Sequence, residues 1–319
     1  MLAMKIFRHL DEVPENFGPT VVSIGNFDGL HRAHQSVLRE VIARARQLGG
    51  HAMAMTFDPH PTRILRPDQD LRLISPTPIK LKLFEQTGVD GVLLLPFSRD
   101  LSMMSPRAFV EEILVNKLHA KEVHEGFNFH FGHKASGNPQ VLSELGREFG
   151  FEVVTYPEMM LRKEKVSSSE VRRLISQGNV SKARHLLGRV FSIHSTPGRG
   201  RGYGHKYTVP TINLSRYDEL VPKNGVYITR SRIGQECFDS VTNVGVRPTF
   251  GPDSFAIESH LLNFHPIELQ ADTPIELMFL KWLRPEMKFE SVDALREQIA
   301  RDVHKARRFF HHLEKRERK

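Results

Sequence analysis

The sequence has very little cysteine and tryptophan: Cys237 and Trp282 are the single examples in 319 residues. One cysteine cannot form a disulfide within the chain, which excludes a disulfide-stapled fold and is typical of a reducing compartment. No apolar run is long enough to cross a bilayer, and residues 1–8 lack the apolar core of a signal peptide. We therefore expect a cytoplasmic protein without a membrane partner.

Charge of one sign does not dominate the chain. The 45 Lys and Arg residues outnumber the 37 Asp and Glu residues to give a net charge of +8. This balance suits a polyanionic ligand, and nucleotides meet that description as well as nucleic acids do. Because 319 residues exceed what one hydrophobic core usually serves, we expect two domains.

The first part of the chain alternates strand and helix patterns. The expected strands are 20–24, 52–57, 91–97 and 151–156, and the expected helices start near residue 35 and span 79–87 and 106–118. Strands that alternate with helices predict a parallel sheet with right-handed crossovers. The pattern Gly-x-Gly-x-x-Gly is missing here, which disfavours a flavoenzyme oxidoreductase.

Residues 23–34, Ser-Ile-Gly-Asn-Phe-Asp-Gly-Leu-His-Arg-Ala-His, join the first expected strand to the helix that follows it. His31 and His34 are spaced to share one face of the first helical turn. Ligands of open parallel sheets bind beyond the carboxyl ends of the strands, and a helix N-terminus offers unpaired N–H groups to an anion. The segment therefore fits two imidazoles that point at one phosphate chain, although a solvated helix start is the alternative.

A second candidate segment is 126–132, in which phenylalanine occupies every second position between two glycines. This spacing predicts a strand end whose rings are anchored in the core. Asn128, which lies between the rings, would then be held rigidly enough to hydrogen-bond a ligand.

A third candidate segment is the serine triplet at 167–169, which precedes Glu170 and Arg172. By itself the stretch predicts a capping box, in which the first serine and Glu170 satisfy the helix start. Considered together with the histidine segment, it instead predicts hydroxyl and N–H groups, with the Arg172 guanidinium behind them, that bind phosphate.

The histidine segment resembles the nucleotidyltransferase pattern Gly-x-Phe-Asp-x-x-His-x-Gly-His, with Ala33 in place of the later glycine. The first half as a whole resembles the bacterial bifunctional riboflavin kinase/FAD synthetases. The matching pieces are Gly25, Asn26, Phe27 and Asp28 with His31 and His34, residues 56–61, residues 126–132, and Ser167, Ser168 and Ser169 with Arg172.

This resemblance implies an FMN adenylyltransferase with a Rossmann-like fold. His31, His34 and Arg172 would stabilise the α-phosphate during adenylyl transfer. Asn128 would lie near the flavin or the nucleotide. The nucleotide-binding residues would be Gly25, Phe27, Asp28, Ser167, Ser168 and Ser169.

A helical pattern over 180–187 ends before Gly188, and we place the domain boundary there, which gives domains of 1–187 and 188–319. Beyond it, short β-branched runs replace the helical period. Residues 198–206 alternate glycine with larger residues and run into Thr211 and Asn213. Such a loop lets backbone N–H groups approach phosphates, whereas the two later side chains are hard oxygen ligands suited to Mg²⁺. The phosphate-binding candidates in the loop are Gly202, Gly204 and Lys206.

The Pro-Thr-x-Asn motif at 210–213 resembles that of the riboflavin kinase barrel, and 224–227, 243–250 and 257–262 match in the family's order. The resemblance implies a small antiparallel β-barrel with a terminal helix, in which Glu258 is the general base that accepts the proton of the ribityl 5′-hydroxyl. An outward-facing charge on a half-buried strand is the alternative for this residue.

The chain departs from the kinase pattern at two positions, since His205 and Thr208 stand where the family has an arginine and a glycine. A β-branched residue does not readily adopt a positive φ angle, so the loop is expected to follow a different path there.

The C-terminal region predicts a strand at 274–280, a core position for Trp282 and a terminal helix capped by Ser291. Leu295, Ile299 and Val303 form an apolar stripe on that helix, which we interpret as packing. Residues 305–319 are strongly basic and are expected to form a solvated, frayed end.

The sequence thus predicts that the chain makes FAD from riboflavin in two steps that use ATP and Mg²⁺. Its substrates would be riboflavin, FMN and ATP, with no nucleic-acid partner, and a weak homo-oligomer is allowed. One alternative is an adenylyltransferase whose second domain only binds flavin. Another is an RNA-binding protein that uses the loop at 199–206 and the basic tail.

Overall fold

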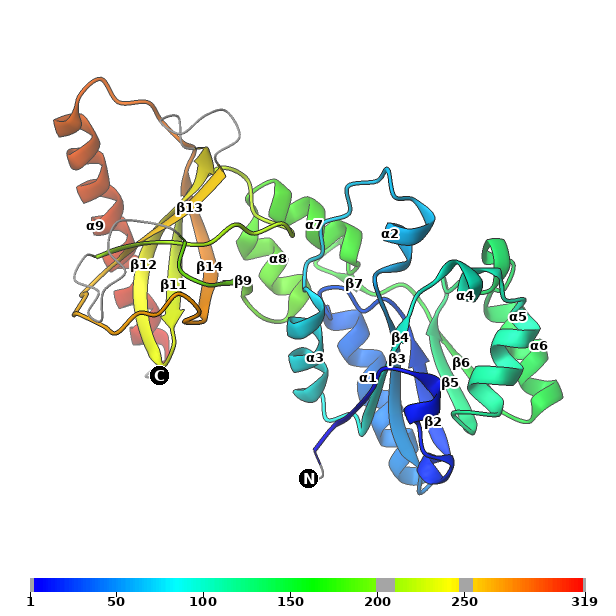
Figure 1. Ribbon diagram of the computed structural model, residues 1–319. Coiled ribbons are helices and arrows are strands. Elements are labelled where there is room, and N and C mark those ends of the chain that lie inside the picture. The colour runs from blue at the N-terminus through cyan, green and yellow to red at the C-terminus, as the bar shows by residue number, and fades with distance from the viewer. Residues whose placement is uncertain (1–2, 199–209, 247–254, 318–319) are drawn as a thin grey trace. The chain divides into compact units, whose positions relative to one another are not determined.

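The computed structural model describes residues 3–198, 210–246 and 255–317. The chain forms two compact units, 1–170 and 171–319, each of which is described by itself (Figure 1). Among the described residues, no helix is both long and apolar enough to cross a membrane.

The first unit is built on a six-stranded parallel sheet with the strand order β1-β4-β3-β2-β5-β6. Its strands are β1 (Lys5–Phe7), β2 (Thr20–Ile24), β3 (His51–Asp58), β4 (Gly91–Pro96), β5 (Ala120–Gly126) and β6 (Glu152–Tyr156). β2 is buried along its whole length, as expected for a parallel sheet that is covered on both faces. The predicted parallel sheet is therefore confirmed.

Helices cover both faces of this sheet. On one face, α1 (Arg32–Gln47) and α3 (Thr77–Glu85) bury Leu38, Val41 and Phe84 against the strands. The other face is covered by α5 (Pro106–Ala108), the π-helical segment η3 (Phe109–Val115) and α6 (Pro139–Phe149). The remaining elements are η1 (Leu10–Glu12), η2 (Glu15–Phe17), α2 (Pro61–Leu65), α4 (Arg99–Met103), η4 (His133–Ala135), β7 (Met160–Leu161) and β8 (Glu164–Lys165).

The helix expected over 106–118 changes its hydrogen-bonding pattern along its length. After α5, the N–H of Asn116 donates to the carbonyl of Glu111, and the N–H of Leu118 donates to that of Ile113. Hydrogen bonds that span five residues define a π-helical turn. The predicted helix is therefore present over 106–115, but most of it is π-helical, and it buries its apolar residues.

The second unit contains a six-stranded antiparallel sheet with the order β10-β13-β12-β11-β14-β9. Its strands are β9 (Phe191–Ser195), β10 (Thr211–Asn213), β11 (Gly225–Ile233), β12 (Glu236–Val246), β13 (Phe255–Leu261) and β14 (Ile275–Arg284). Pro197 forms a bridge with Leu214, and the N–H of Ser215 donates to the carbonyl of Thr196 at 2.8 Å. The two edges of the sheet therefore meet just beyond β9 and β10, which confirms the predicted small barrel.

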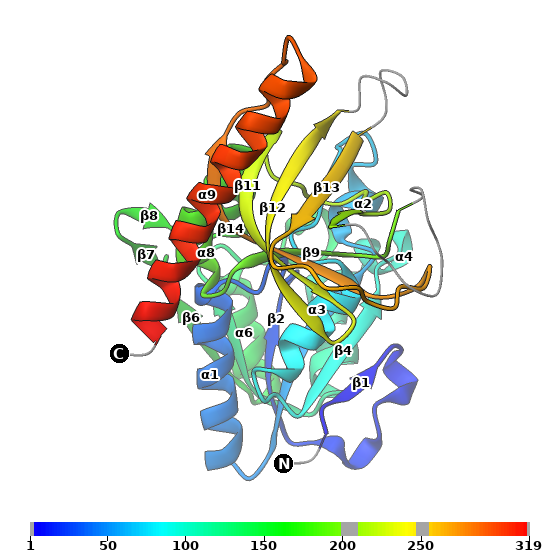
Figure 2. The same cartoon turned by 90° about the vertical axis from the view of Figure 1, so that its left-hand side faces the viewer.

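Three helices accompany the barrel. α7 (Ser168–Ser176) begins in the first unit and continues into the second, and α8 (Val180–Leu187) ends at Gly188, whose φ of 76° is left-handed as a glycine cap allows. The terminal helix α9 (Val292–Glu317) runs along the barrel (Figure 2). It is capped as predicted, because the N–H of Ala294 donates to the Ser291 hydroxyl at 3.1 Å.

The basic C-terminal region is not a frayed end. α9 continues to Glu317, and Ala306 and Phe310 are buried against Val226 and Ile228 of β11. That expectation was wrong because two apolar residues four positions apart are sufficient to seat the helix, even among many basic ones.

The expected packing stripe on α9 is only partly buried. Val303 packs against the barrel cluster, whereas Leu295 and Ile299 are 38% and 41% exposed. The packing interpretation was therefore wrong for these two residues. Trp282 is half-buried, and its ring meets that of Tyr227 edge-on at 5.2 Å.

The barrel interior contains a closed circle of hydroxyl groups, which we call the hydroxyl ring. Its five members are all fully buried and are Thr229, Ser231, Ser240, Thr242 and Ser259. Each hydroxyl lies within 3.0 Å of two others in the circle. Their polar atoms are therefore satisfied inside the barrel.

Candidate active sites

The strand order of the parallel sheet reverses at β2, since β3 and β4 lie on one side of it and β5 and β6 lie on the other. Open α/β sheets bind ligands beside such a switch point, beyond the carboxyl ends of the strands. The chain leaves β2 there through Gly25 and leaves β5 through Gly126. Glu125 connects the two exits, because its carboxyl group accepts the N–H of Ile24.

The turn between β2 and α1 is left-handed at three residues. The φ angles are 48° at Phe27, 77° at Gly29 and 37° at Leu30. Such angles cost a non-glycine residue about 1–3 kcal/mol and persist only where the surroundings fix them. Phe27 and Leu30 are each 2% exposed, and the Phe27 ring packs edge-on against Phe84 of α3. The turn is therefore a rigid base for the histidines that follow it.

The two histidines of the turn lie in direct contact. His31 caps α1: its Nδ1 accepts the N–H of His34 at 3.4 Å. The rings stack with their centroids 3.7 Å apart. Burial and the neighbouring His31 lower the pKa of His34 well below its usual value, so this imidazole is neutral. Its Nδ1 is buried and has no hydrogen-bond partner in the described part of the chain, which is a costly state.

The structure places residues 74–75 and the serine segment against Asp28, within this turn. The Asp28 carboxylate accepts the N–H groups of Ile74 and Ser75 at 3.1 and 3.0 Å. The hydroxyl of Ser168 donates to the backbone oxygen of Asp28 at 2.8 Å. The serine segment and the histidine turn, far apart in the sequence, are thus brought together.

The serine segment also caps its helix, as the stretch alone predicts. The Ser167 hydroxyl accepts the N–H of Glu170 at 3.2 Å. Ser169 is exposed, and the half-buried Arg172 lies one turn into α7.

Asn128 is exposed in the turn that follows β5, and its backbone oxygen lies 2.9 Å from Nδ1 of His130. The three phenylalanines of this segment differ in burial. Phe131 is 7% exposed and stacks on Phe129, whereas Phe127 is 47% exposed. The prediction that the rings are anchored in the core was wrong for Phe127, because the strand ends at Gly126 and the alternation ends with it.

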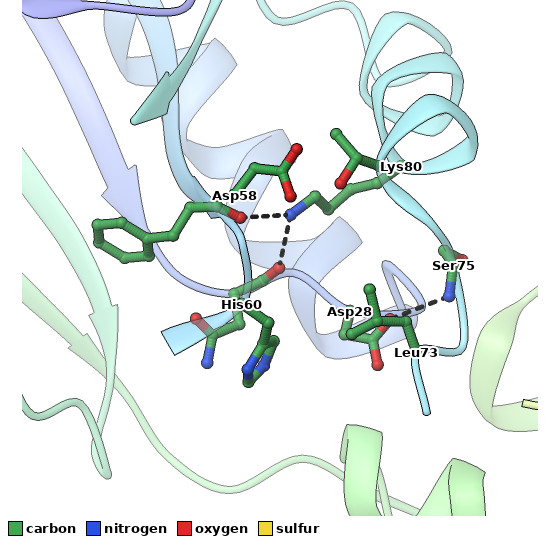
Figure 3. A pocket seen from close by; sticks show the side chains of 9 residues that line it. Asp28, Asp58, His60, Leu73, Ser75 and Lys80 are labelled. Carbon is green, nitrogen blue, oxygen red and sulfur yellow. Dashed lines mark hydrogen bonds between the residues drawn. The ribbon is translucent and has the colours of Figure 1, made fainter. Parts of the chain in front are cut away.

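One functional candidate escaped the sequence analysis. Lys80 lies in a small pocket at the carboxyl ends of β2 and β3, with Asp28, Asp58 and His60 in the same lining (Figure 3). The side chain is 5% exposed although it carries an ammonium group. The sequence does contain a signal for its burial, because Lys80 lies three and four positions before Leu83 and Phe84, on the apolar face of α3.

The barrel carries a second polar site on two neighbouring strands. The register pairs Thr211 with His260 and Asn213 with Glu258. Side chains directly opposite each other lie on the same face, and alternate residues share that face, so all four project from one side of the sheet. The Thr211 hydroxyl lies 3.2 Å from His260 Nδ1. Burial, followed by the charge of Arg307, lowers the pKa of His260.

The donor set of this face fits a magnesium ion. Thr211 and Asn213 supply hydroxyl and amide oxygens, which are among the hard ligands that Mg²⁺ prefers. The residues that the structure describes include no cluster of three or more His, Cys, Asp or Glu side chains able to hold a metal ion. Gly202, Gly204 and Lys206, together with His205 and Thr208, lie outside the described residues.

The architecture defines a two-domain protein that joins a Rossmann-like unit to a small β-barrel, each with a polar site of its own. Residues 13–170 match the FAD synthetase family, and residues 187–310 match the riboflavin kinase family. The chain belongs to the family of bifunctional riboflavin kinase/FMN adenylyltransferases, as relatives that span nearly its whole length establish.

The relatives carry both domains in one chain. A bifunctional riboflavin kinase/FMN adenylyltransferase from Pseudomonas fluorescens is 35% identical over 312 residues, which cover 95% of this chain and 97% of the relative. One from Listeria monocytogenes is 32% identical over 297 residues, which cover 92% and 93%. A crystal structure described as a macrolide-efflux protein from Streptococcus pneumoniae is 25% identical, with a TM-score of 0.82 over 96% of this chain and 99% of that one.

Proposed function

We propose that this chain makes FAD from riboflavin in two ATP-dependent steps, which are phosphorylation to FMN and adenylylation of FMN. The observation that carries the proposal is that one chain matches both families and has a separate polar site in each domain. We place the boundary between the two activities at residues 187 and 188. We also place the enzyme in the cytoplasm, in keeping with its single free cysteine.

In the first domain, the phosphate of FMN attacks the α-phosphorus of ATP, and pyrophosphate leaves. The nucleophile is already an anion, so no general base is required. Catalysis depends on placing the two phosphates and on donors aimed at the charge that develops between them. His31, His34 and Arg172 supply these donors. The stacking of the two imidazoles at the start of α1 supports this assignment, since it holds both groups at one place.

Other residues of the first domain hold the nucleotide and the flavin. The rigid turn with Gly25, Phe27 and Asp28 shapes the nucleotide site, and Asn128 contacts the flavin or the nucleotide from the exit of β5. The hydroxyl and N–H groups of the serine segment bind the triphosphate at the start of α7. These binding residues are Ser167, Ser168 and Ser169. The bond from Ser168 to Asp28 supports this arrangement, since it fixes one segment against the other.

In the barrel, Glu258 accepts the proton of the riboflavin 5′-hydroxyl as that oxygen attacks the γ-phosphorus of ATP. Thr211 and Asn213 hold Mg²⁺, which neutralises charge on the phosphates when it is bound. Asn213 lies directly opposite Glu258, so base and metal ligand share one face of the barrel. Gly202, Gly204 and Lys206 belong to the phosphate-binding loop.

The test is a time course of riboflavin, FMN and FAD, separated by chromatography, after riboflavin, ATP and Mg²⁺ are added to the purified protein. We expect FMN to appear first and FAD to follow it. Formation of FAD from supplied FMN, without any conversion of riboflavin, would identify an adenylyltransferase whose barrel only binds flavin. Absence of both products would refute the proposal.

A further inference from the structure

Lys80 is a buried cation of the first unit that the proposed chemistry does not use. Its ammonium nitrogen lies 3.0 Å from the hydroxyl of Thr56, 3.2 Å from the carbonyl of Phe57 and 3.4 Å from the carbonyl of Asn26. The side chain reaches these oxygens from α3, and Figure 3 shows the ammonium group joined to oxygens at the strand ends. An ammonium group has three hydrogens, so these three acceptors use all of them.

The acceptors lie at the ends of β2 and β3, and the proposed site is built on the first of these ends. Asn26 begins the left-handed turn that leads to His31, and Phe57 precedes Asp58 at the end of β3. The Thr56 hydroxyl donates in turn to the same Asn26 carbonyl at 3.2 Å, so one oxygen receives hydrogen bonds from both side chains. Lys80 therefore ties the exit of β2 to the exit of β3.

Burial of an ammonium group is expensive unless its hydrogen bonds and nearby charges offset the loss of water. The ionisable groups that share the pocket with Lys80 are Asp28, Asp58 and His60. Burial lowers the pKa of Lys80 to about 8, and the charges of Asp28 and Asp58 oppose that shift. The ammonium form therefore predominates at pH 7 and is lost as the pH rises above 8.

We propose that Lys80 is a positioning residue for adenylyl transfer: its ammonium group fixes the carbonyls of Asn26 and Phe57 and thereby sets the turn that aims His31 and His34. This inference rests on the proposed function. Lys80 acts through the backbone, and no contact with the reacting atoms is required. A misplacement of catalytic groups by 1 Å lowers a rate by roughly 100-fold, which sets the size of the expected effect.

The experiment compares Lys80→Met with the wild type and with Lys82→Met, which removes an exposed lysine from the same helix. The same polypeptide provides an internal control, because conversion of riboflavin to FMN takes place in the other domain. For Lys80→Met we expect kcat for FAD formation to fall about 100-fold, with little change in KM for FMN and with FMN formation unchanged. Lys82→Met should match the wild type in both reactions.

A pH profile of the wild type provides a second test that does not depend on the variant folding. FAD formation should decline above pH 8, where the ammonium form is lost, while FMN formation in the same samples should not follow that decline. In Lys80→Met the residual rate should lack this alkaline decline. Lys80→Arg keeps a cation at high pH, so its rate of FAD formation should not decline above pH 8 either.

Two results would overturn the inference: a Lys80→Met rate within threefold of the wild type, or wild-type FAD formation that is constant to pH 9.5. A wild-type protein that makes no FAD from FMN and ATP would instead refute the proposed function, and this would be evident before any variant is made.

Discussion

The hydroxyl of Ser168 donates a 2.8 Å hydrogen bond to the backbone oxygen of Asp28, 140 residues earlier in the chain. This bond fastens the start of α7 to the turn that carries the two histidines. It makes the serine segment part of one rigid arrangement with the exit of β2. The segment therefore does more than cap its own helix.

Replacing Ser168 by alanine should weaken adenylyl transfer while it leaves the barrel untouched. One hydrogen bond contributes about 1 kcal/mol, so we expect kcat/KM for FAD formation to fall about fivefold to tenfold. FMN formation should not change. Ser143→Ala is a matched control, because it removes a hydroxyl that donates to the carbonyl of Pro139 at 2.8 Å, within α6. Equal losses in both variants would contradict the role of Ser168.

The double variant His31→Ala, His34→Ala should stop FAD formation and leave FMN formation intact. Loss of one well-aimed donor typically lowers a rate by roughly 10²- to 10³-fold, and two are lost here. Product formation from riboflavin and from supplied FMN, measured separately, tests this division. A folded double variant that also fails to make FMN would contradict it.

Glu258→Gln should have the opposite effect. Without a base on β13, conversion of riboflavin to FMN should fall by roughly 10²- to 10⁴-fold, whereas FAD should still form when FMN is supplied. Glu276→Gln is the matched control, since Glu276 is a half-buried glutamate on β14 of the same barrel. That variant should form FMN at nearly the wild-type rate, and an equal loss there would indicate a general effect on the barrel.

Glu125→Gln should stabilise the first unit at neutral pH. Burial raises the pKa of the Glu125 carboxyl group well above its usual value of 4.5, so this group keeps its proton to a higher pH in the fold than in the unfolded chain. The contribution of this group to the stability of the wild type is therefore complete below pH 4.5 and is lost as the pH rises towards the folded pKa. Relative to the Glu125→Gln variant, which has no proton to lose at this position, the wild type loses about 1.4 kcal/mol per pH unit.

Denaturant unfolding of both forms at pH 4.5 and pH 7.5 measures this difference. The two curves should nearly coincide at the lower pH and separate at the higher one. Glu152→Gln, which changes an exposed glutamate on the neighbouring strand β6, should show no such separation. If the difference in free energy of unfolding between Glu125→Gln and the wild type is the same at both pH values, the raised pKa of Glu125 is contradicted.

Phe310→Ala should destabilise the barrel by about 3–5 kcal/mol, since it removes a ring that is 4% exposed where α9 meets β11. Leu295→Ala on the same helix should cost much less, because Leu295 is 38% exposed. Thermal unfolding of the two variants compares these positions. Similar midpoints would contradict the seating of the C-terminal helix on the barrel.

Local features of the sequence predict much of this fold. The β-branched run of β2 gives a buried strand, and Gly188 marks the end of α8 because only a residue tolerant of left-handed angles fits there. The three-residue spacing of His31 and His34 already places them on one turn. The alternation of strands and helices gives the parallel sheet without any tertiary information.

Other features depend on contacts that local patterns do not contain. The bond between Ser168 and Asp28 joins segments whose proximity depends on the whole sheet order. Lys80 was not predicted as a site residue, because an isolated lysine in a helix is normally assigned to the solvent face. In the structure, its ammonium group instead donates hydrogen bonds to carbonyl oxygens at two strand ends. The packing of α9 on the barrel was not predicted, because basic residues surround the two buried residues Ala306 and Phe310 in the sequence.

The hydroxyl ring couples five side chains of the barrel interior to one another. Each hydroxyl has a single hydrogen, so five bonds around a circle must all run in the same sense, and Thr242 as donor to Ser259 sets that sense for every member. Exchange of one of these side chains for alanine or valine leaves a donor and an acceptor unpaired in the buried interior. Changes at these five positions are therefore coupled, because a single apolar substitution costs about 1–3 kcal/mol unless the neighbouring hydroxyls change with it.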